Sequence, residues 1–404
     1  MEPLEAKRLL SKYLFACNPV GQPRHITMVA VGPKLRNGRP TGEMAIIIGV
    51  AKKLPPQMLQ SSSSFEANMR LWRSLMPLQA NAHLVMIPPE IAGIKTDVQE
   101  KPIYQHFSSS VCGVLAEVQA AITELQAAYG CSSNGNGSSI QNRQKFRPTI
   151  PAGASTILHG STACTLTGWV IDKATGLYRA IVAHHCGEDF TNCTPAPAGS
   201  VWVQPSPMDG GSDADHWATR GTEEVDMKDA HVDAFVLDPE DQAMFTNEIV
   251  GLGTIDGKAL DPQQGEMASM SGRTSGVIQG VITSPSADVS INYEGCGILT
   301  KEDTVITQLP AQGGDSGSPC VLTRDGKQLI FGQLIAGGSG EGVAFKIQYI
   351  EEGYKCDFDI SQAPPSPPTP PNPPSPTEEV QYSVDDGLTW QTAESIIVKP
   401  VPAS

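Results

Sequence analysis

The chain has 404 residues and a formal net charge of -15. This length predicts two or three domains, and many Gly and Pro residues, with few long helical charge patterns, predict a mainly β protein. The acidic charge excludes sequence-independent binding of nucleic acid, which requires a basic face. No stretch reaches the roughly 18 consecutive apolar residues that span a bilayer, so we expect no membrane insertion.

The N-terminal segment carries scattered charges and lacks the apolar core of a secretory signal, so it predicts an amphipathic helix. The missing signal favours the cytoplasm. Nine cysteines would instead suit an extracellular protein if they form disulfides. The sequence leaves both locations open.

Residues 1–130 are predicted to form an N-terminal α/β domain with flanking helices. Runs of β-branched residues at 25–33 and 43–54, separated by a turn-forming segment, predict two strands. Apolar residues at heptad spacing over 109–128 predict a helix. That helix would pack on the neighbouring domain or mediate self-association, so a homo-oligomer through the N-terminal region is one alternative.

The rest of the chain divides by composition into four further segments. Residues 131–146 are rich in Gly, Ser and Asn and predict a flexible linker with nothing to bury. Residues 147–358 contain short β-type runs between turn residues, as in a sandwich or a barrel. Residues 359–378 predict an extended Pro-rich linker, and residues 379–404 predict a short β-hairpin tail around an Asp-Asp-Gly turn.

The segment GGDSGSPC, residues 313–320, is a candidate nucleophile loop. Glycines on both sides of Ser316 permit backbone conformations that a Cβ would exclude, and they permit close approach of a substrate. Such a loop could aim the amides of Gly314 and Ser316 at one point as an oxyanion hole. A Gly/Ser-rich turn without chemistry is the alternative for this segment alone.

A serine nucleophile needs a base, and that base needs a partner. His184 and His185 stand at the end of a predicted strand, where a ring is held rigidly yet stays accessible. Asp233 enters an apolar strand, which is costly for a carboxylate unless it is paired, as it would be with a histidine N–H. A lone surface histidine is the alternative for either ring. The order His, Asp, Ser differs from that of α/β-hydrolases, whose G-x-S-x-G motif fails here because residue 318 is serine.

Three of these segments resemble the motifs of chymotrypsin-like serine peptidases: AHHC at 183–186, DAFVL at 233–237 and GGDSGSP at 313–319. The segments SGRTSGVIQGVI at 271–282 and FGQLIAGGSG at 331–340 are similar to the bacterial, streptogrisin-like branch. The resemblance covers about residues 150–352. It implies a double antiparallel β-barrel with the active site between the barrels.

The same resemblance implies a serine endopeptidase that hydrolyses protein or peptide substrates through a covalent acyl-enzyme. Ser316 would be the nucleophile, His185 the general base and Asp233 its orienting partner. The amides of Gly314 and Ser316 would form the oxyanion hole.

The resemblance also implies a substrate-binding strand and a specificity pocket. Ala336, Gly337 and Gly338 would pair with substrate backbone, and Pro310 would line the pocket base. Without a charge in that pocket, cleavage after small or apolar residues is expected.

Structural support is implied at three further places. Arg273 is expected to form an ion pair with Asp315, with a surface arginine as the alternative. Two disulfides are implied: Cys164–Cys186 and Cys296–Cys320. The first domain resembles a module that precedes some bacterial and plant trypsin-like proteins.

No Cys/His spacing fits a zinc site and no phosphate-binding Gly loop precedes a helix, so no metal or cofactor is expected. Residues 209–217 predict an acidic surface loop rather than a calcium site. Two other functions stay open: a protease-derived binding or scaffold protein whose triad is unused, and an esterase-like hydrolase with the same site.

Overall fold

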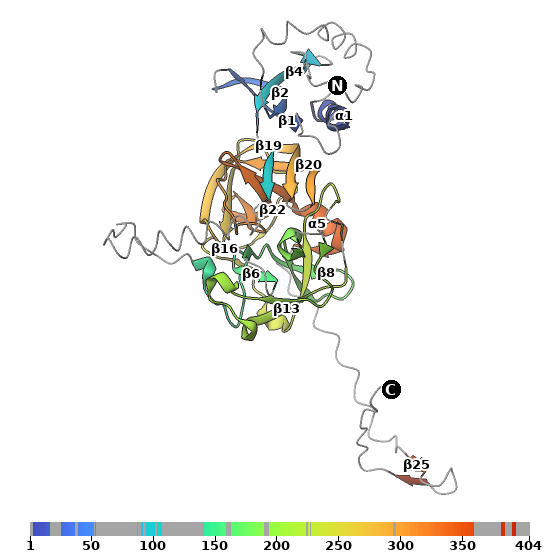
Figure 1. Ribbon diagram of the computed structural model, residues 1–404. Coiled ribbons are helices and arrows are strands. Elements are labelled where there is room, and N and C mark those ends of the chain that lie inside the picture. The colour runs from blue at the N-terminus through green and yellow to red at the C-terminus, as the bar shows by residue number, and fades with distance from the viewer. Residues whose placement is uncertain are drawn as a thin grey trace, which may run out of the picture. The chain divides into compact units, whose positions relative to one another are not determined.

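The computed structural model is mainly β, as the sequence predicts (Figure 1). Its contacts divide the chain into two units, residues 1–363 and 364–404. It describes residues 3–16, 26–36, 39–51, 53, 87, 90, 91, 94–101, 103–106, 141–158, 163–189, 194–223, 225, 226, 228–293, 296–358, 381–383 and 390–392.

A first antiparallel barrel forms early in the predicted peptidase domain. Its strands are β6 (Ser155–Leu158), β7 (Cys164–Thr165), β8 (Gly168–Asp172), β9 (Tyr178–Val182), β12 (Val201–Val203), β13 (His216–Arg220) and β14 (Phe235–Pro239). They pair in the order β8-β9-β14-β13-β12-β6-β7. Because β7 continues along the chain into β8, this ring is closed. Trp169, Trp202 and Trp217 fill its core.

A second antiparallel barrel follows. Its strands are β18 (Met267–Gly272), β19 (Gly276–Tyr293), β20 (Gly297–Thr307), β21 (Pro319–Arg324), β22 (Lys327–Gly338) and β23 (Glu341–Lys346). They pair in the order β18-β21-β22-β23-β20-β19, and β18 also pairs with β19, which closes the ring. The double antiparallel β-barrel expected from the motifs is therefore confirmed.

One apolar cluster joins the two barrels. It combines Val170 and Ile181 of the first barrel with Val321 and Ile330 of the second. Helix α5 (Ile347–Tyr354) contributes its apolar face to the same cluster. Burial of such side chains contributes about 1.5–3 kcal/mol each, so this cluster holds the barrels in a defined arrangement and fixes the site between them.

The remaining described elements of this region are short. The strands are β10 (Glu188–Asp189), β11 (Thr194–Pro195), β15 (Glu248–Ile249), β16 (Gly253–Thr254), β17 (Gly257–Lys258) and β24 (Cys356–Asp357). The 3-10 helices are Gln141–Arg143, His184–Gly187, Pro207–Asp209, Asp213–Asp215 and Gln242–Met244.

The N-terminal region adds strands to the second barrel. It contains α1 (Pro3–Ala16), β1 (Ile26–Arg36), β2 (Arg39–Val50), β3 (Glu90–Ile91), β4 (Ile94–Glu100) and β5 (Tyr104–His106). The expected N-terminal helix and the two expected strands are present. Strand β1 pairs with the long strand β19, with Met28 opposite Val289 and Ala30 opposite Ala287. A separate domain boundary near residue 130 stays a prediction, and the helix expected over 109–128 lies outside the described residues.

The segment expected as a linker is partly packed. Within the described residues 141–146, Asn142 is buried, and its amide donates to the Gly153 carbonyl at 2.7 Å and to Ser271 Oγ at 2.8 Å. The carbonyl of Gln144 accepts from Gln204 Nε2 at 2.7 Å. The polar composition predicted a solvated linker. The Asn142 side chain and the Gln144 carbonyl instead form hydrogen bonds with residues of the packed region.

The C-terminal unit contains the expected hairpin. Strand β25 (Gln381–Ser383) pairs antiparallel with β26 (Trp390–Thr392). The Pro-rich segment 359–378 lies outside the described residues. No helix in the described part of the chain is both long and apolar enough to cross a membrane.

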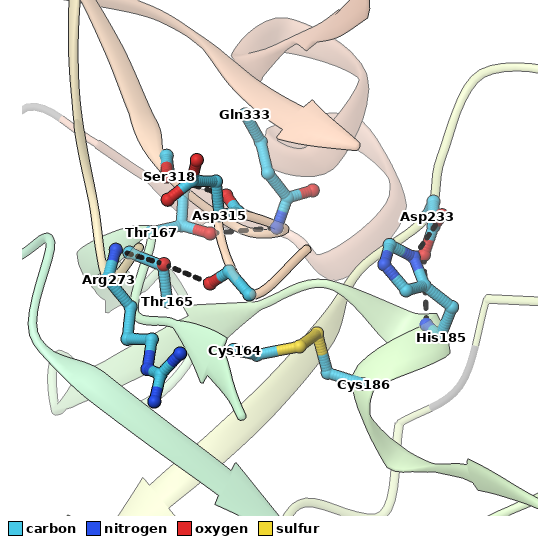
Figure 2. Close-up of a disulfide and its surroundings, with 11 residues drawn as sticks. Cys164, Thr165, Thr167, His185, Cys186, Asp233, Arg273, Asp315, Ser318 and Gln333 are labelled. Carbon is cyan, nitrogen blue, oxygen red and sulfur yellow. Dashed lines mark hydrogen bonds and ion pairs between the residues drawn. A yellow bond between two sulfur atoms is a disulfide. The ribbon is translucent and has the colours of Figure 1, made fainter. Parts of the chain in front are cut away.

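The cysteines follow one of the two expected pairings. Cys164 and Cys186 form a disulfide (Figure 2). The pairing of Cys296 with Cys320 is wrong, because Cys296 is disulfide-bonded and Cys320 is a free, buried thiol. The Cys320 side chain belongs to the second barrel's core cluster with Leu322 and Phe331. Burial there raises the pKa of Cys320 to about 12.

Candidate active site

The nucleophile loop lies between the two barrels. The Ser316 carbonyl accepts from Thr165 N at 2.8 Å, and the Gly314 carbonyl accepts from Thr165 Oγ1 at 2.8 Å. From the other barrel, the Leu334 carbonyl accepts from Gly317 N at 2.8 Å. Gly317 has φ +89°, and a Cβ there would lie 2.1 Å from the Thr165 carbonyl oxygen. Only glycine fits this position, which explains the residue that follows the serine.

His185 and Asp233 meet because their strands are paired. Phe235 of β14 lies opposite Val182 of β9, so the residue two places before β14 reaches the turn just after β9. Asp233 Oδ2 lies 2.8 Å from His185 Nδ1, and Asp233 Oδ1 accepts from the His185 main-chain N–H at 3.1 Å. Two bonds from one carboxylate fix both the ring and the backbone of the histidine (Figure 2). The Cys164–Cys186 disulfide anchors the next residue.

The nucleophile loop and the histidine turn are packed together. A Cβ at Gly317 would lie 3.5 Å from Ala183 N, and Ala183 precedes the His184–Gly187 turn directly. Ser316 is fully buried, and His185 is 1% exposed. The Ser316 hydroxyl forms no hydrogen bond with a described residue. The loop that carries Ser316 is therefore packed beside the turn that carries His185, and the Ser316 side chain is covered.

Asp233 carries its charge inside the protein. It is fully buried, and burial alone would raise its pKa, but the His185 ring and the Lys301 ammonium hold that pKa below its ordinary value. Lys301 is fully buried too, and its Nζ donates to the Asp229 carbonyl at 2.8 Å and to the Val232 carbonyl at 3.3 Å. This lysine thus fixes the backbone that leads into Asp233.

Sequence reasoning missed Lys301, and it also missed Tyr293. Its hydroxyl donates to Asp233 Oδ2 at 2.8 Å, and its side chain is fully buried at the end of β19. The same carboxylate oxygen therefore accepts from both Tyr293 and His185. Nothing in the local sequence around Tyr293 signals this role, because the contact joins the end of the long strand β19 to a residue 60 positions earlier in the chain.

If the site hydrolyses peptides, replacing Tyr293 with phenylalanine is expected to lower kcat by about 10- to 150-fold while KM stays unchanged, because a hydrogen bond to a charged group contributes about 1.5–3 kcal/mol. Steady-state kinetics on a peptide substrate checks this. Tyr349→Phe is the matched control, since Tyr349 donates to the Asp303 carboxylate at 2.6 Å on another face of the barrel. A Tyr293→Phe variant with unchanged kcat, or with the loss confined to KM, contradicts the positioning role.

The expected ion pair between Arg273 and Asp315 is wrong. Arg273 pairs instead with Asp209, through Nε at 2.8 Å and Nη2 at 2.6 Å. Asp315 accepts from the main-chain N–H groups of Thr274 at 2.8 Å and Ser275 at 2.9 Å. Figure 2 shows the Arg273 guanidinium pointing away from Asp315. Backbone amides of the turn thus bind the carboxylate that the arginine was expected to bind.

The expectation for Asp209 was also wrong, because its side chain is buried. Residues 209–217 were expected to form an acidic surface loop, yet the Asp209 side chain is 3% exposed. It also accepts from Ser155 Oγ at 2.6 Å and Ser206 Oγ at 3.0 Å. Burial alone would raise the pKa of Asp209, but these donors and Arg273 hold it below its ordinary value. The pair ties the first barrel to the turn that holds Asp315.

The strand expected to bind substrate backbone is already paired. On one edge of β22, Gly337 lies opposite Gly342 and Gly338 opposite Glu341 of β23. On the other edge, Ala336 lies opposite His106 of β5. Pro310 is exposed between β20 and the nucleophile loop, and its role in a pocket stays a prediction. Among the described residues, no group of three or more His, Cys, Asp or Glu side chains is placed to hold a metal ion.

No protein-family model matches the chain, and no curated protein matches it. Similar solved structures include a Nocardiopsis protease (17% identity, 52% of this chain, 98% of that chain, TM-score 0.39). Cellulomonas bogoriensis chymotrypsin (19%, 52%, 97%, TM-score 0.38) and Thermobifida fusca protease A (18%, 52%, 97%, TM-score 0.38) are others. Similarity at this level carries no argument about activity. These similar structures are proteases, the class of proteins that the motifs of this chain resemble.

Proposed function

We propose that the chain is a serine endopeptidase that hydrolyses protein or peptide substrates through a covalent acyl-enzyme. The observation that carries this proposal is the 2.8 Å contact between His185 Nδ1 and a buried, ionised Asp233 beside the Ser316 loop. That contact selects the imidazole tautomer whose Nε2 accepts a proton. A buried carboxylate is too costly to keep for stability alone when a neutral residue would pack as well.

In the proposed reaction, Ser316 Oγ attacks the substrate carbonyl carbon as its proton passes to His185 Nε2. The same proton then goes to the leaving amine as the C–N bond breaks, and water hydrolyses the ester by the reverse route. The amides of Gly314 and Ser316 would stabilise the oxyanion. No hydrogen bond joins either amide to another described residue, whereas Asp315 N donates to the Gln312 carbonyl and Gly317 N to the Leu334 carbonyl.

The alternative is a protease-derived binding protein with an unused triad. Full burial of Ser316 is the observation that favours it. An esterase-like activity of the same site is distinguished from peptidase activity by comparing the hydrolysis of amide and ester substrates that share one acyl residue.

Labelling of the full-length chain with a fluorophosphonate probe tests the proposal. The probe reacts only with a serine activated by a base and an oxyanion hole, so we expect labelling at Ser316 that is absent in Ser316→Ala. Peptide hydrolysis is measured in parallel. A chain that neither reacts nor hydrolyses peptides, even after limited proteolysis within residues 107–140, contradicts the proposal and favours the binding protein.

A further inference from the structure

The strands β19 and β20 are antiparallel neighbours in the second barrel and carry two side chains near Asp233 (Figure 1). Lys301 of β20 lies opposite Val289 of β19, and Tyr293 follows four residues further along β19. Side chains alternate between the two faces of a strand, and directly opposite residues share a face. Lys301 and Tyr293 therefore point to the same side of the strand pair, and Lys301 Nζ lies 5.4 Å from the centroid of the Tyr293 ring.

The Lys301 ammonium is enclosed by the protein. Its side chain is fully buried, and the ring centroid of Phe345 lies 5.5 Å from Nζ, in addition to that of Tyr293. Both distances are within the range of a cation–π contact. The carbonyls of Asp229 and Val232 accept from Nζ at 2.8 Å and 3.3 Å. The positive charge is thus held at a defined place inside the protein.

That place is next to the carboxylate that binds His185. Val232, whose carbonyl accepts from Lys301, is joined by its peptide bond to Asp233. The hydroxyl of Tyr293 donates to Asp233 Oδ2 while its ring contacts the ammonium. Burial would raise the pKa of Asp233, but the charges of His185 and Lys301 hold it below its ordinary value. Lys301 therefore acts electrically on the same carboxylate as the histidine.

The other titratable groups on the surrounding elements have partners of their own. The carboxylate of Asp303 binds Lys346 at 2.8 Å, that of Asp288 binds Lys7, and that of Asp229 accepts from the main-chain N–H groups of residues 231 and 232 at 2.7 Å and 3.1 Å. His231 and Glu302 line a separate cavity beside α1. The ring of His184 lies 3.9 Å from that of Phe235. These groups are the same in all variants of Lys301, so a comparison of such variants isolates the effect of the ammonium.

We propose, building on the proposed function, that Lys301 is a positioning residue for His185. Its charge keeps the imidazole ring in the unprotonated form that accepts the serine proton, and its hydrogen bonds hold the backbone that leads into Asp233. The residue does not touch the reacting atoms and acts on His185 through Asp233.

The sign of the effect follows from the charge. A positive charge lowers the affinity of a neighbouring group for a proton, so the His185–Asp233 pair takes up a proton at a higher pH once the ammonium is removed. Only the unprotonated ring is an active base, and the acid limb of kcat/KM reports the loss of that form in the free protein. Removal of the Lys301 charge is therefore expected to move the acid limb upwards by about 1 pH unit.

The pH dependence of kcat/KM for the wild type, Lys301→Gln and Lys301→Met tests the inference. Glutamine removes the charge but keeps a side-chain N–H that can donate to the two carbonyls, whereas methionine removes both. An apolar side chain of similar volume is often tolerated in place of a buried charge. We expect the acid limb to move in both variants, and the plateau to fall further in Lys301→Met. Lys258→Gln is the matched control, because its ammonium contacts Glu351 at 2.8 Å and Asp357 at 2.7 Å, and it should keep the wild-type limb.

NMR titration of isotope-labelled histidine in the same variants reads the protonation of the His185 ring without turnover, with His185→Gln to identify its signal. A titration and an acid limb that both stay at the wild-type pH in Lys301→Gln overturn the inference and leave the endopeptidase standing. A lower plateau with an unmoved limb does the same, because Lys301 would then act through its hydrogen bonds alone. A chain that hydrolyses no peptide and reacts with no fluorophosphonate overturns the endopeptidase, and the NMR titration then decides the inference by itself.

Discussion

If the chain is the proposed endopeptidase, the Asp233→Asn variant is expected to lose about four orders of magnitude in kcat, with KM nearly unchanged. In the folded protein, the Asp233 carboxylate accepts from His185 Nδ1, His185 N and Tyr293 Oη. An asparagine amide directed at Nδ1 would donate to it, and the ring would then carry its proton on Nε2. A histidine in that tautomer is unable to accept the serine proton. Steady-state kinetics and the rate of fluorophosphonate labelling measure the loss.

Asp238→Asn is the matched control for this prediction. Asp238 lies on β14, close to Asp233 in the chain, but its half-exposed carboxylate pairs with Arg179 at 2.7 Å and not with the histidine. The control should keep the wild-type kcat. If Asp233→Asn retains more than about a tenth of the wild-type kcat, the carboxylate does not set the tautomer of His185.

Replacing Asp209 with alanine is expected to destabilise the fold by about 3–5 kcal/mol, because removing one partner of a buried ion pair leaves the other charge uncompensated. The Arg273 side chain is only 9% exposed, so water replaces its partner poorly. For a protein of this size the melting temperature should fall by about 4–6 °C. Differential scanning calorimetry of the two proteins measures the change.

The double variant Asp209→Ala/Arg273→Met should recover part of the lost stability, because it removes the buried Arg273 charge that Asp209→Ala leaves without its partner. Asp213→Ala, an exposed aspartate in the same loop, is the matched control. If the double variant is less stable than Asp209→Ala, the Arg273 guanidinium stabilises the fold through contacts other than its ion pair with Asp209.

The same pair gives a pH dependence of stability. The pKa of Asp209 is lower in the folded protein than in the unfolded chain, so protons bind the unfolded form preferentially. Its stabilising contribution is complete above the unfolded pKa, about 4, and is lost as the pH falls through the lower folded pKa. Acid denaturation of Asp209→Ala should accordingly be less steep over that range than that of the wild type.

The motif residues were predictable because their signals are local. The glycine after Ser316 and the apolar strand after Asp233 each reflect a constraint that acts within a few residues. The barrels were also predictable as a class, since short β-type runs between turn residues are their sequence signature. Their closure into two rings was implied only by the family resemblance.

The partners of the charged residues were not predictable in the same way. Arg273 has several acidic candidates, and the choice of Asp209 over Asp315 follows from the backbone amides of Thr274 and Ser275, which already satisfy Asp315. The missed contact of Tyr293 with Asp233 joins distant strands. Pairings of this kind depend on three-dimensional packing, which composition and residue spacing do not reveal.

The pairing of β1 with β19 also has a consequence for synthesis. The ribosome adds about 5–20 residues per second, so residues 26–36 leave it roughly 10–50 s before the end of β19 is made. During that interval the outer edge of β1 has no β19 to pair with, and an unpaired strand edge is a template for wrong pairing with other chains. Strand β1 is therefore synthesised early but lacks its native neighbour β19 for this whole interval, and during that time it must be kept from pairing with other chains.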